Sequence, residues 1–298
     1  MAALALHSLA AYGAYVWVTT SRSNKAEPVP VKALDQQEDS SHVFDEIAQH
    51  YDRDIRTSEF FMGLPLLRWS MAKRARVGFP NWQPVWMATD GLRGNCQGDV
   101  LEASAGTGRN TKYYPLRGGG GARRVESVTF VDSSGPMLEV ARRAFQQRYP
   151  GYKAAHFAVR DAAAPGLRAP SGGKFDTVLQ SMGLCSHRSP VQLLCALGEA
   201  CKADGTIVLL EHGRSHYGWL NRILDRTADG HAQAWGCWWN RDVEAIVRAS
   251  GLRIVALKRY HLGTTYWIEA KPPLRRGGEV ADEGVAKDGG AGEPGRTL

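Results

Sequence analysis

The sequence predicts an α/β fold built on a mostly parallel, seven-stranded sheet with a terminal antiparallel hairpin. Short apolar runs typical of strands alternate along the chain with segments whose apolar residues recur at helical spacing. The last two runs are joined only by His261-Leu262-Gly263, which is too short a link for a parallel crossover, so these two strands are predicted to be antiparallel. At 298 residues the chain suits one large domain with appended segments.

The predicted strands are short apolar segments bounded by turn residues. They are expected at 100–102, 127–131, 154–159, 175–180, 206–210, 252–257 and 265–270. The fifth run is uninterrupted in its apolar character, as expected of a strand that is covered on both faces. Residues 202–205 read Lys-Ala-Asp-Gly and are expected to turn into that strand.

The predicted helices have recognisable starts and stops. One helix is expected over 136–149, where Pro150 ends the apolar periodicity. Ser189-Pro190 supplies a cap and a first-turn proline for the next helix. Asn240 is expected to cap the last helix, which closes at Gly251.

A glycine-rich turn follows the first strand. Residues 100–110 read Val-Leu-Glu-Ala-Ser-Ala-Gly-Thr-Gly-Arg-Asn, so an apolar strand ends in an acidic residue and runs into two glycines. Glycines let the backbone approach a ligand closely, and a following helix would present its unpaired N–H groups there. The second strand ends in Asp132, where a carboxylate can accept hydrogen bonds from both hydroxyls of a ribose. The pattern predicts a nucleotide-like cofactor.

A dinucleotide is the first alternative ligand, and the spacing disfavours it. Thr111 stands where the third glycine of the dinucleotide fingerprint belongs, and Asp132 comes later than the offset of about 20 residues which that fingerprint requires. A dinucleotide also leaves Glu102 unexplained. A cofactor with an adenosine, an amino-acid tail and no pyrophosphate explains it, and S-adenosylmethionine has that chemistry.

These residues resemble the first motif of the class I S-adenosylmethionine-dependent methyltransferases, an acidic residue followed by alternating glycines. The resemblance implies a seven-stranded Rossmann-like methyltransferase sheet and S-adenosyl-L-methionine as cofactor. The chain departs from the motif at Ser104, where the family usually has a glycine, so a slightly repositioned turn is expected. The cofactor-binding residues carried over are Glu102, Ser104, Ala105, Gly106, Thr107, Gly108, Asn110, Asp132, Ser133, Met137, Asp161, Ala162 and Gln180.

Two of these assignments have structural alternatives. The family's acidic residue after the third strand accepts from the adenine amino group, and Asp161 matches that position, but it could also simply cap the loop. Gln180 matches the position that backs the methionine portion of the cofactor, but it could equally be a buried amide with its own partners.

Methyl transfer demands little acid–base chemistry from the protein. The cofactor carries its own leaving group, so positioning and desolvation contribute most of the rate, and a general base is needed only where the acceptor must lose a proton. The candidate bases are Tyr51, His212 and His231, together with His216. A structural, hydrogen-bonding role is the alternative for each histidine.

A long insertion between the fifth strand and the last helix is rich in tryptophan. Its aromatic residues stand where class I enzymes build a substrate lid, which would suit an apolar or amphipathic acceptor. The alternative is a small subcore beneath the insertion. The residues concerned are Trp219, Trp235, Trp238 and Trp239.

A narrower resemblance covers residues 41–272. Residues 44–48 (Phe-Asp-Glu-Ile-Ala), Tyr51-Asp52 and the Trp-Gly-Cys-Trp-Trp-Asn segment at 235–240 resemble the membrane-anchored, methyltransferase-like mitochondrial proteins of fungi and protists, the Oms type. Leu184 to Ser186 and Gly236-Cys237 also resemble, more loosely, the membrane-anchored thiol methyltransferases of animals. The first resemblance implies a mitochondrial inner-membrane location, with the endoplasmic reticulum membrane as the alternative.

The two ends of the chain differ in composition from the predicted domain at 41–272. Residues 1–19 are almost wholly apolar and are expected to form a single-pass membrane anchor, with a cleaved signal peptide as the alternative. Residues 20–40 are rich in Pro, Ser, Glu and Gln and are expected to be a linker. Residues 273–298 are rich in glycine and charge and are expected to be a disordered tail.

Charge and cysteine content argue against two kinds of ligand. The net charge is +7, but no basic motif interleaved with aromatic residues accompanies it, so no nucleic acid is expected as a partner. The five cysteines form no C-x-x-C pair. His231 and Cys237 have no third ligand at zinc-like spacing, so no metal is expected.

The sequence thus favours a membrane-tethered, S-adenosylmethionine-dependent methyltransferase that acts on a small amphipathic acceptor, a thiol, a quinone precursor or a lipid. The first alternative is a non-catalytic assembly factor of the mitochondrial inner membrane that retains the fold, and Ser104 is the feature that supports it. A protein or RNA methyltransferase and a nicotinamide oxidoreductase are further alternatives.

Overall fold

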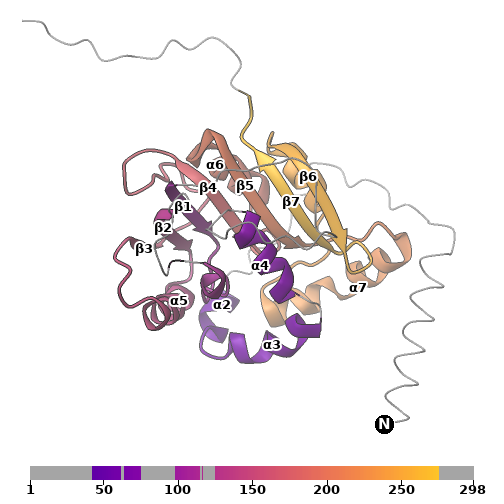
Figure 1. The fold of residues 1–298 in the computed structure, drawn as a ribbon. Helices are drawn as coiled ribbons and strands as arrows, with labels where there is room; N and C mark the ends of the chain where they lie inside the picture. Colours follow the sequence, from indigo (N-terminus) through magenta and orange to yellow (C-terminus); the bar gives the residue numbers. More distant parts are fainter. Residues whose placement is uncertain (1–41, 62–63, 75–97, 115, 117–124, 275–298) are drawn as a thin grey trace, which may run out of the picture.

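The computed structural model describes residues 42–61, 64–74, 98–114, 116 and 125–274. They form one seven-stranded sheet in the order β3-β2-β1-β4-β5-β7-β6, in which β7 alone runs antiparallel to its neighbours (Figure 1). The strands are β1 Gly98–Ala103, β2 Val125–Asp132, β3 Ala155–Val159, β4 Phe175–Ser181, β5 Cys201–His212, β6 Arg253–Tyr260 and β7 Thr265–Lys271. This confirms the predicted α/β sheet and its terminal hairpin.

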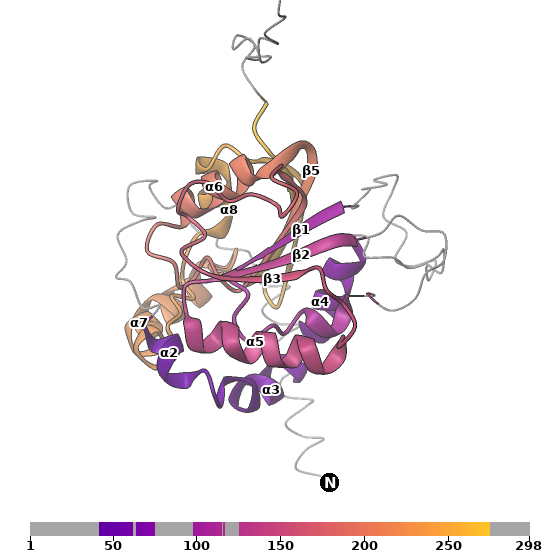
Figure 2. The ribbon, with the colours of Figure 1, turned by 90° about the vertical axis from the view of Figure 1, so that its left-hand side faces the viewer.

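Helices cover both faces of this sheet. They are α2 Val43–Ile47, α3 Tyr51–Phe61, α4 Leu64–Arg74, α5 Gly135–Arg148, α6 Pro190–Ala200, α7 Gly218–Trp235 and α8 Val243–Ala249, with a short 3-10 helix at Thr111–Tyr113. In Figure 2, α3, α4 and α5 lie on one side of the strands, and α6 and α8 lie on the other. The sheet is therefore the middle of three layers.

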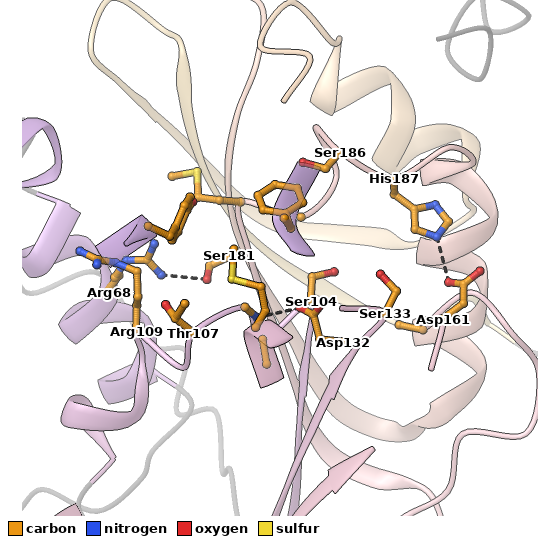
Figure 3. A pocket seen from close by; sticks show the side chains of 18 residues that line it. Arg68, Ser104, Thr107, Arg109, Asp132, Ser133, Asp161, Ser181, Ser186 and His187 are labelled. Atoms are coloured by element: carbon orange, nitrogen blue, oxygen red, sulfur yellow. Dashed lines mark hydrogen bonds and ion pairs between the residues drawn. The ribbon is translucent and has the colours of Figure 1, made fainter. Parts of the chain in front are cut away.

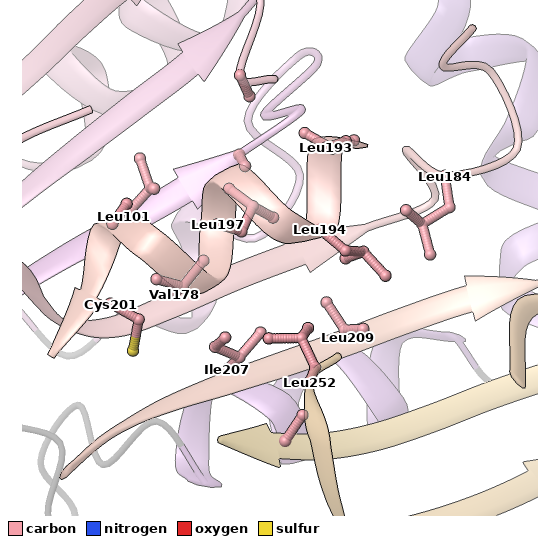
Figure 4. Packing of buried hydrophobic residues seen from close by; sticks show 14 of the residues in the cluster. Leu101, Val178, Leu184, Leu193, Leu194, Leu197, Cys201, Ile207, Leu209 and Leu252 are labelled. Atoms are coloured by element: carbon pink, nitrogen blue, oxygen red, sulfur yellow. The ribbon is translucent and has the colours of Figure 1, made fainter. Parts of the chain in front are cut away.

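Two hydrophobic cores separate the layers. On one face, α6 packs Leu193, Leu194 and Leu197 onto strand residues that include Val178 and Ile207 (Figure 4). On the other face, Met71 of α4 lies in a second core with side chains of α5, β1 and β2. The central strands β1 and β4 are buried on both faces, and they bury polar side chains such as Asp99, Glu102 and Gln180 together with the apolar ones.

The three N-terminal helices were not predicted as separate elements, and they determine the shape of the site. Helix α2 packs against α5 and α7, while α3 packs on α4 and α4 packs on β5. Figures 1 and 2 place this group over the ends of the central strands. It joins the Rossmann-like core to α7. Helix α7 makes up most of the long insertion after β5.

Two predicted details at the element ends are wrong, and a third is confirmed in position only. The last helix is capped by Asp242, whose side chain accepts from Ala245 N at 3.0 Å, and not by Asn240. The expected turn at 202–205 belongs to β5, whose pairing with β4 shifts register near Phe175. The side chain of Ser189 makes no capping hydrogen bond, although it does occupy the cap position before Pro190. Short polar residues are favoured at several neighbouring positions of such a loop, and tertiary packing selects among them.

The predicted anchor and linker lie outside the described residues, as does all but the start of the predicted tail, 273–298. Among the helices that the structure describes, none is both long enough and apolar enough to span a bilayer.

Candidate functional site

The glycine-rich turn after β1 has the backbone that the motif predicts. Gly106 and Gly108 have φ angles of +55° and +75°, in the left-handed region that glycine adopts readily. Gly106 N donates to the Asp132 carboxylate at 2.7 Å, which ties the turn to the end of β2. A Cβ on Gly106 would meet no atom within 4 Å, whereas one on Gly108 would press on Ala141 of α5 at 3.0 Å. The first glycine faces open space, and the second permits close helix packing.

Ser104 adopts the conformation that the family usually assigns to glycine. Its φ is +49°, which is unusual for a residue with a side chain. A Cβ on Gly183, in the loop after β4, would lie 2.5 Å from the Ser104 Cβ, so the serine fits because its neighbour is a glycine. The serine thus adopts the left-handed backbone at this turn.

A pocket opens at the carboxyl ends of β1, β2, β3 and β4. It holds about 800 Å³ of space free of protein atoms, part of which is open to solvent. Figure 3 shows Arg68 and Arg109 at one end, and Asp161 and His187 at the other. The predicted cofactor residues that line it are Ser104, Ala105, Gly106, Thr107, Asp132, Ser133, Met137, Asp161 and Ala162.

Asp132 lines the pocket at the carboxyl end of β2. Its carboxylate accepts from Gly106 N at 2.7 Å and from Ser134 N at 2.9 Å. Burial raises the pKa of Asp132 above its usual value, against the opposing effect of these two backbone donors, and nearby Asp45 raises it further. A ligand that donates hydroxyl hydrogen bonds to this carboxylate would favour its ionised form.

The exposed end of the pocket contains a pair that the sequence did not suggest. Asp161 accepts from Ala163 N at 2.8 Å, as a loop cap would, and it also contacts His187 Nε2 at 2.9 Å. The Asp161 side chain remains 54% exposed, so its carboxylate can still receive a donor from the pocket.

The guanidinium end of the pocket comes from the N-terminal helices. Arg68 of α4 donates to Asn110 Oδ1 at 3.0 Å, to Ser181 Oγ at 2.9 Å and to Glu59 Oε1 at 2.9 Å. Glu59 also accepts from Arg109, so one buried carboxylate joins two cations. Burial alone would raise the pKa of Glu59, but Arg68 and Arg109 hold it below its usual value.

A further contact connects this network to the glycine turn. Asp52 of α3 accepts from Thr107 Oγ1 and from Arg109 Nη1, both at 2.7 Å. Glu59, Arg68 and Arg109 were missed from the sequence because they belong to no local motif. Only α3 has an amphipathic pattern that could have served as a signal, and that pattern does not indicate which charged residues face inward.

Four predicted cofactor residues lie behind the pocket wall and not on it. Glu102 accepts from Asn110 Nδ2 at 2.9 Å and from the Tyr114 hydroxyl, and burial raises its pKa to about 7. Gly108 packs on α5. Gln180 is fully buried, and neither of its side-chain polar atoms has a hydrogen-bond partner among the described residues. Glu102 and Asn110 thus support the turn from beneath.

The predicted catalytic residues lie in different places. Tyr51 lines the pocket beside Phe44, and burial raises the pKa of its hydroxyl far above the usual range. His212 lies behind the wall with its Nε2 2.6 Å from Cys237 Sγ. His231 contacts the Cys237 carbonyl at 2.8 Å and stacks on Trp239. Only Tyr51 of these candidates faces the pocket in this structure.

Trp219 and Trp235 belong to α7, and Trp238 and Trp239 belong to the turn after it. None of the four lines the pocket as the structure describes it. Trp239 donates to Leu224 O at 3.1 Å and so packs back on α7, as in the subcore alternative. Trp238 N donates to Cys185 O at 3.0 Å, which attaches this turn to the pocket loop. Trp219 is partly buried, and Trp235 is 36% exposed.

Comparison with known proteins agrees with this geometry. A family described as a methyltransferase domain matches residues 100–205. The chain is 38% identical over 244 residues to the protein named "Methyltransferase OMS1, mitochondrial" of Saccharomyces cerevisiae; the match covers 78% of this chain and 46% of that protein, so the chain spans about half the length of this relative.

Solved structures show the same fold. The magnesium protoporphyrin IX methyltransferase of Synechocystis PCC 6803, solved with bound SAM, has a TM-score of 0.50 at 16% identity over 79% of this chain and 97% of its own. DhpI in complex with SAH has a TM-score of 0.50 at 17% identity, with the same coverage.

These matches identify a methyltransferase domain of the class I S-adenosylmethionine-dependent type in this chain, with S-adenosyl-L-methionine as its cofactor. Within that class it is close to the Oms type, as the residues at 44–52 and 235–240 suggested.

Proposed function

We propose that this domain transfers a methyl group from S-adenosylmethionine to a small amphipathic acceptor. The observation that carries the proposal is the contrast between the two ends of one pocket. Carboxylates lie at one end and guanidinium groups at the other, and the cofactor itself carries ribose hydroxyls and an adenine at one end and an amino-acid carboxylate at the other.

The proposed cofactor contacts follow from that polarity. Asp132 would accept from the ribose hydroxyls, and Asp161 would accept from the adenine amino group. Arg68 and Arg109 would face the amino-acid carboxylate. The side-chain amide of Gln180 has no hydrogen-bond partner among the described residues and lies next to Gly183 on the pocket loop. Because buried polar groups are normally hydrogen-bonded, this is an argument that a polar group of a ligand binds nearby.

In the proposed reaction, the acceptor atom attacks the methyl carbon in line with the sulfonium. The carbon–sulfur bond breaks as the new bond forms, S-adenosylhomocysteine leaves, and any acceptor proton passes to solvent or to a nearby base. The protein's residues chiefly hold the two reactants and exclude water. Phe44, Tyr51 and Met182 give the acceptor side of the pocket an apolar surface, which suits a thiol, a quinone precursor or a lipid.

Location and attachment belong to the same proposal. The relative's printed name places it in the mitochondrion, and residues 1–19 are apolar enough for an anchor, so we propose a mitochondrial, membrane-tethered enzyme. The assembly-factor alternative relied on Ser104, and the left-handed turn at that residue supports the enzyme over that alternative.

The test is calorimetric titration of the full chain with S-adenosylmethionine, S-adenosylhomocysteine and NAD, followed by transfer of labelled methyl to thiol, quinol and phospholipid acceptors. We expect micromolar binding of the first two ligands, loss of binding in Asp132→Ala, and wild-type binding in Glu139→Ala, which removes an exposed carboxylate of α5. Absence of binding by wild-type protein would refute the enzyme and leave the assembly factor. Binding of NAD alone would indicate an oxidoreductase.

A further inference from the structure

We propose that Cys185, His212 and Cys237 form a zinc site beside the cofactor pocket. Their two sulfur atoms and a ring nitrogen all lie within 4.8 Å of one another. Cys185 belongs to the loop after β4, His212 is the last residue of β5, and Cys237 follows α7. The fold thus brings together three metal-binding side chains from segments far apart in the sequence.

The donor set is the one that zinc prefers. Two thiolates and one imidazole are soft and borderline ligands, and they suit zinc better than magnesium or calcium. Both cysteines are nearly inaccessible, with exposures of 2% and 5%. The other described cysteines differ, since Cys195 donates to Ser250 O at 3.5 Å and Cys201 packs in the core under α6.

The three ligand atoms lie within 4.8 Å of one another, so small movements would give the separations of a tetrahedral site. Bonds of about 2.3 Å to sulfur and about 2.0 Å to nitrogen place two sulfur ligands about 3.8 Å apart, and sulfur and nitrogen about 3.5 Å apart. His212 Nε2 and Cys237 Sγ are 2.6 Å apart, so they would separate by about 1 Å to admit the ion. Cys237 lies in a turn outside regular secondary structure, which can accommodate that movement.

Surrounding hydrogen bonds hold the ligand segments in place. Trp238 N donates to Cys185 O at 3.0 Å and joins the two cysteine-bearing segments. Glu211, the neighbour of His212, accepts from Gly183 N and Leu184 N, each at 3.2 Å. Such contacts outside the ligand shell orient metal ligands.

The site adjoins the pocket. Gly183 and Ser186, on either side of Cys185, line the pocket, and so does Tyr51. Three protein ligands leave a fourth tetrahedral position for water or another ligand, as in zinc sites that are not purely structural. The sequence led to the opposite expectation because it paired Cys237 with His231; the structure instead places His212 against the sulfur, and His231 against the Cys237 carbonyl.

The first experiment uses the full wild-type chain, purified in reductant. We expect one zinc per chain after exhaustive dialysis, and one cobalt(II) per chain after zinc removal and cobalt addition. The cobalt form should show a thiolate-to-cobalt charge-transfer band and the intense visible bands of a tetrahedral site. Zinc should protect Cys185 and Cys237 from alkylation while leaving Cys195 as reactive as in the metal-free chain.

Variants separate metal binding from folding. Cys185→Ser and His212→Gln should each weaken zinc affinity by more than about 100-fold, beyond the loss typical of a residue outside the ligand shell. Cys195→Ser is the matched control and should bind zinc as wild type does, and S-adenosylhomocysteine binding and circular dichroism report folding in each variant. Any of three results would overturn the proposal. They are the absence of a cobalt band after cobalt is added to metal-free wild-type protein, a cobalt band that survives Cys185→Ser, and a Cys185–Cys237 disulfide that persists in protein purified in reductant. If a variant fails to fold, the wild-type alkylation pattern decides.

Discussion

The two ends of the pocket are built in different ways. The carboxylate end consists of residues at the carboxyl ends of strands. Asp132 is the last residue of β2, Asp161 comes shortly after β3, and both accept hydrogen bonds from backbone N–H groups. The guanidinium end is a buried network in which Glu59 of α3 joins Arg68 of α4 to Arg109 of the glycine turn. We infer that the carboxylate end serves mainly to recognise the cofactor, whereas the guanidinium end also stabilises the fold.

The largest effect should come from the centre of the network. Glu59→Ala leaves Arg68 buried without its carboxylate partner and leaves Arg109 with Asp52, and we expect a loss of about 3–5 kcal/mol in the free energy of unfolding. Chemical denaturation measures it, with Glu244→Ala as the control because its ion pair with Arg248 is exposed. A loss under about 1 kcal/mol would mean that the network does not stabilise the fold and would remove the contrast between the two ends.

The pH dependence of the free energy of unfolding gives a second test at Glu59, with Glu59→Gln as the variant. The folded-state pKa of Glu59 lies below its unfolded value, so its contribution is fully present above pH 4.5 and is lost as pH falls through the lower, folded pKa. Wild type and Glu59→Gln should therefore approach each other in stability as the solution is acidified. Equal pH slopes in the two proteins would contradict the assignment.

Glu102 should behave in the opposite sense. Burial raises the pKa of Glu102 from 4.5 to about 7 in the folded state. Between these two pH values the folded chain keeps the Glu102 proton that the unfolded chain has lost, so the free energy of unfolding falls as pH rises through this window. Glu102→Gln keeps an acceptor for Tyr114 and Asn110 without a charge. We expect the variant to be more stable than wild type by about 2–3 kcal/mol at pH 8 and nearly equal to it at pH 4. Urea titrations across this range measure the difference, and an unchanged gap would refute the raised pKa.

The carboxylate end should respond in binding more than in stability. Asp132→Asn retains one acceptor for the backbone donors but weakens the proposed ribose contacts. We expect about a 30-fold loss of S-adenosylhomocysteine affinity, which is about 2 kcal/mol, with little change in Tm. Calorimetry and thermal unfolding measured on the same protein compare the two quantities. A large loss of Tm with unchanged affinity would reverse the proposed roles of the two ends.

The same contrast explains what the sequence could predict. The positions of the strands, the hairpin, the glycine turn and the place of Asp132 follow from local patterns, since each depends on residues within a few positions of one another. Arg68, Glu59 and His187 could not be found in this way, because their roles depend on how distant helices and loops meet. Gln180 and Asn110 fell on the right strand and turn, but a sequence motif does not distinguish a pocket-facing side chain from one behind the wall.

The smallest expected effect tests the one departure from the glycine motif. Ser104 pays for its left-handed backbone with strain of about 1–2 kcal/mol, while a glycine there would lose about 0.5–1 kcal/mol more chain entropy on folding. Ser104→Gly should therefore be more stable by about 0.5–1 kcal/mol, whereas Ser104→Ala, which keeps the Cβ beside Gly183, should gain nothing. Denaturation midpoints of the three proteins measure this. Equal gains in both variants would mean that the hydroxyl, and not the backbone conformation, is the unfavourable group, and a loss in the glycine variant would mean that the serine itself holds the turn at the carboxylate end.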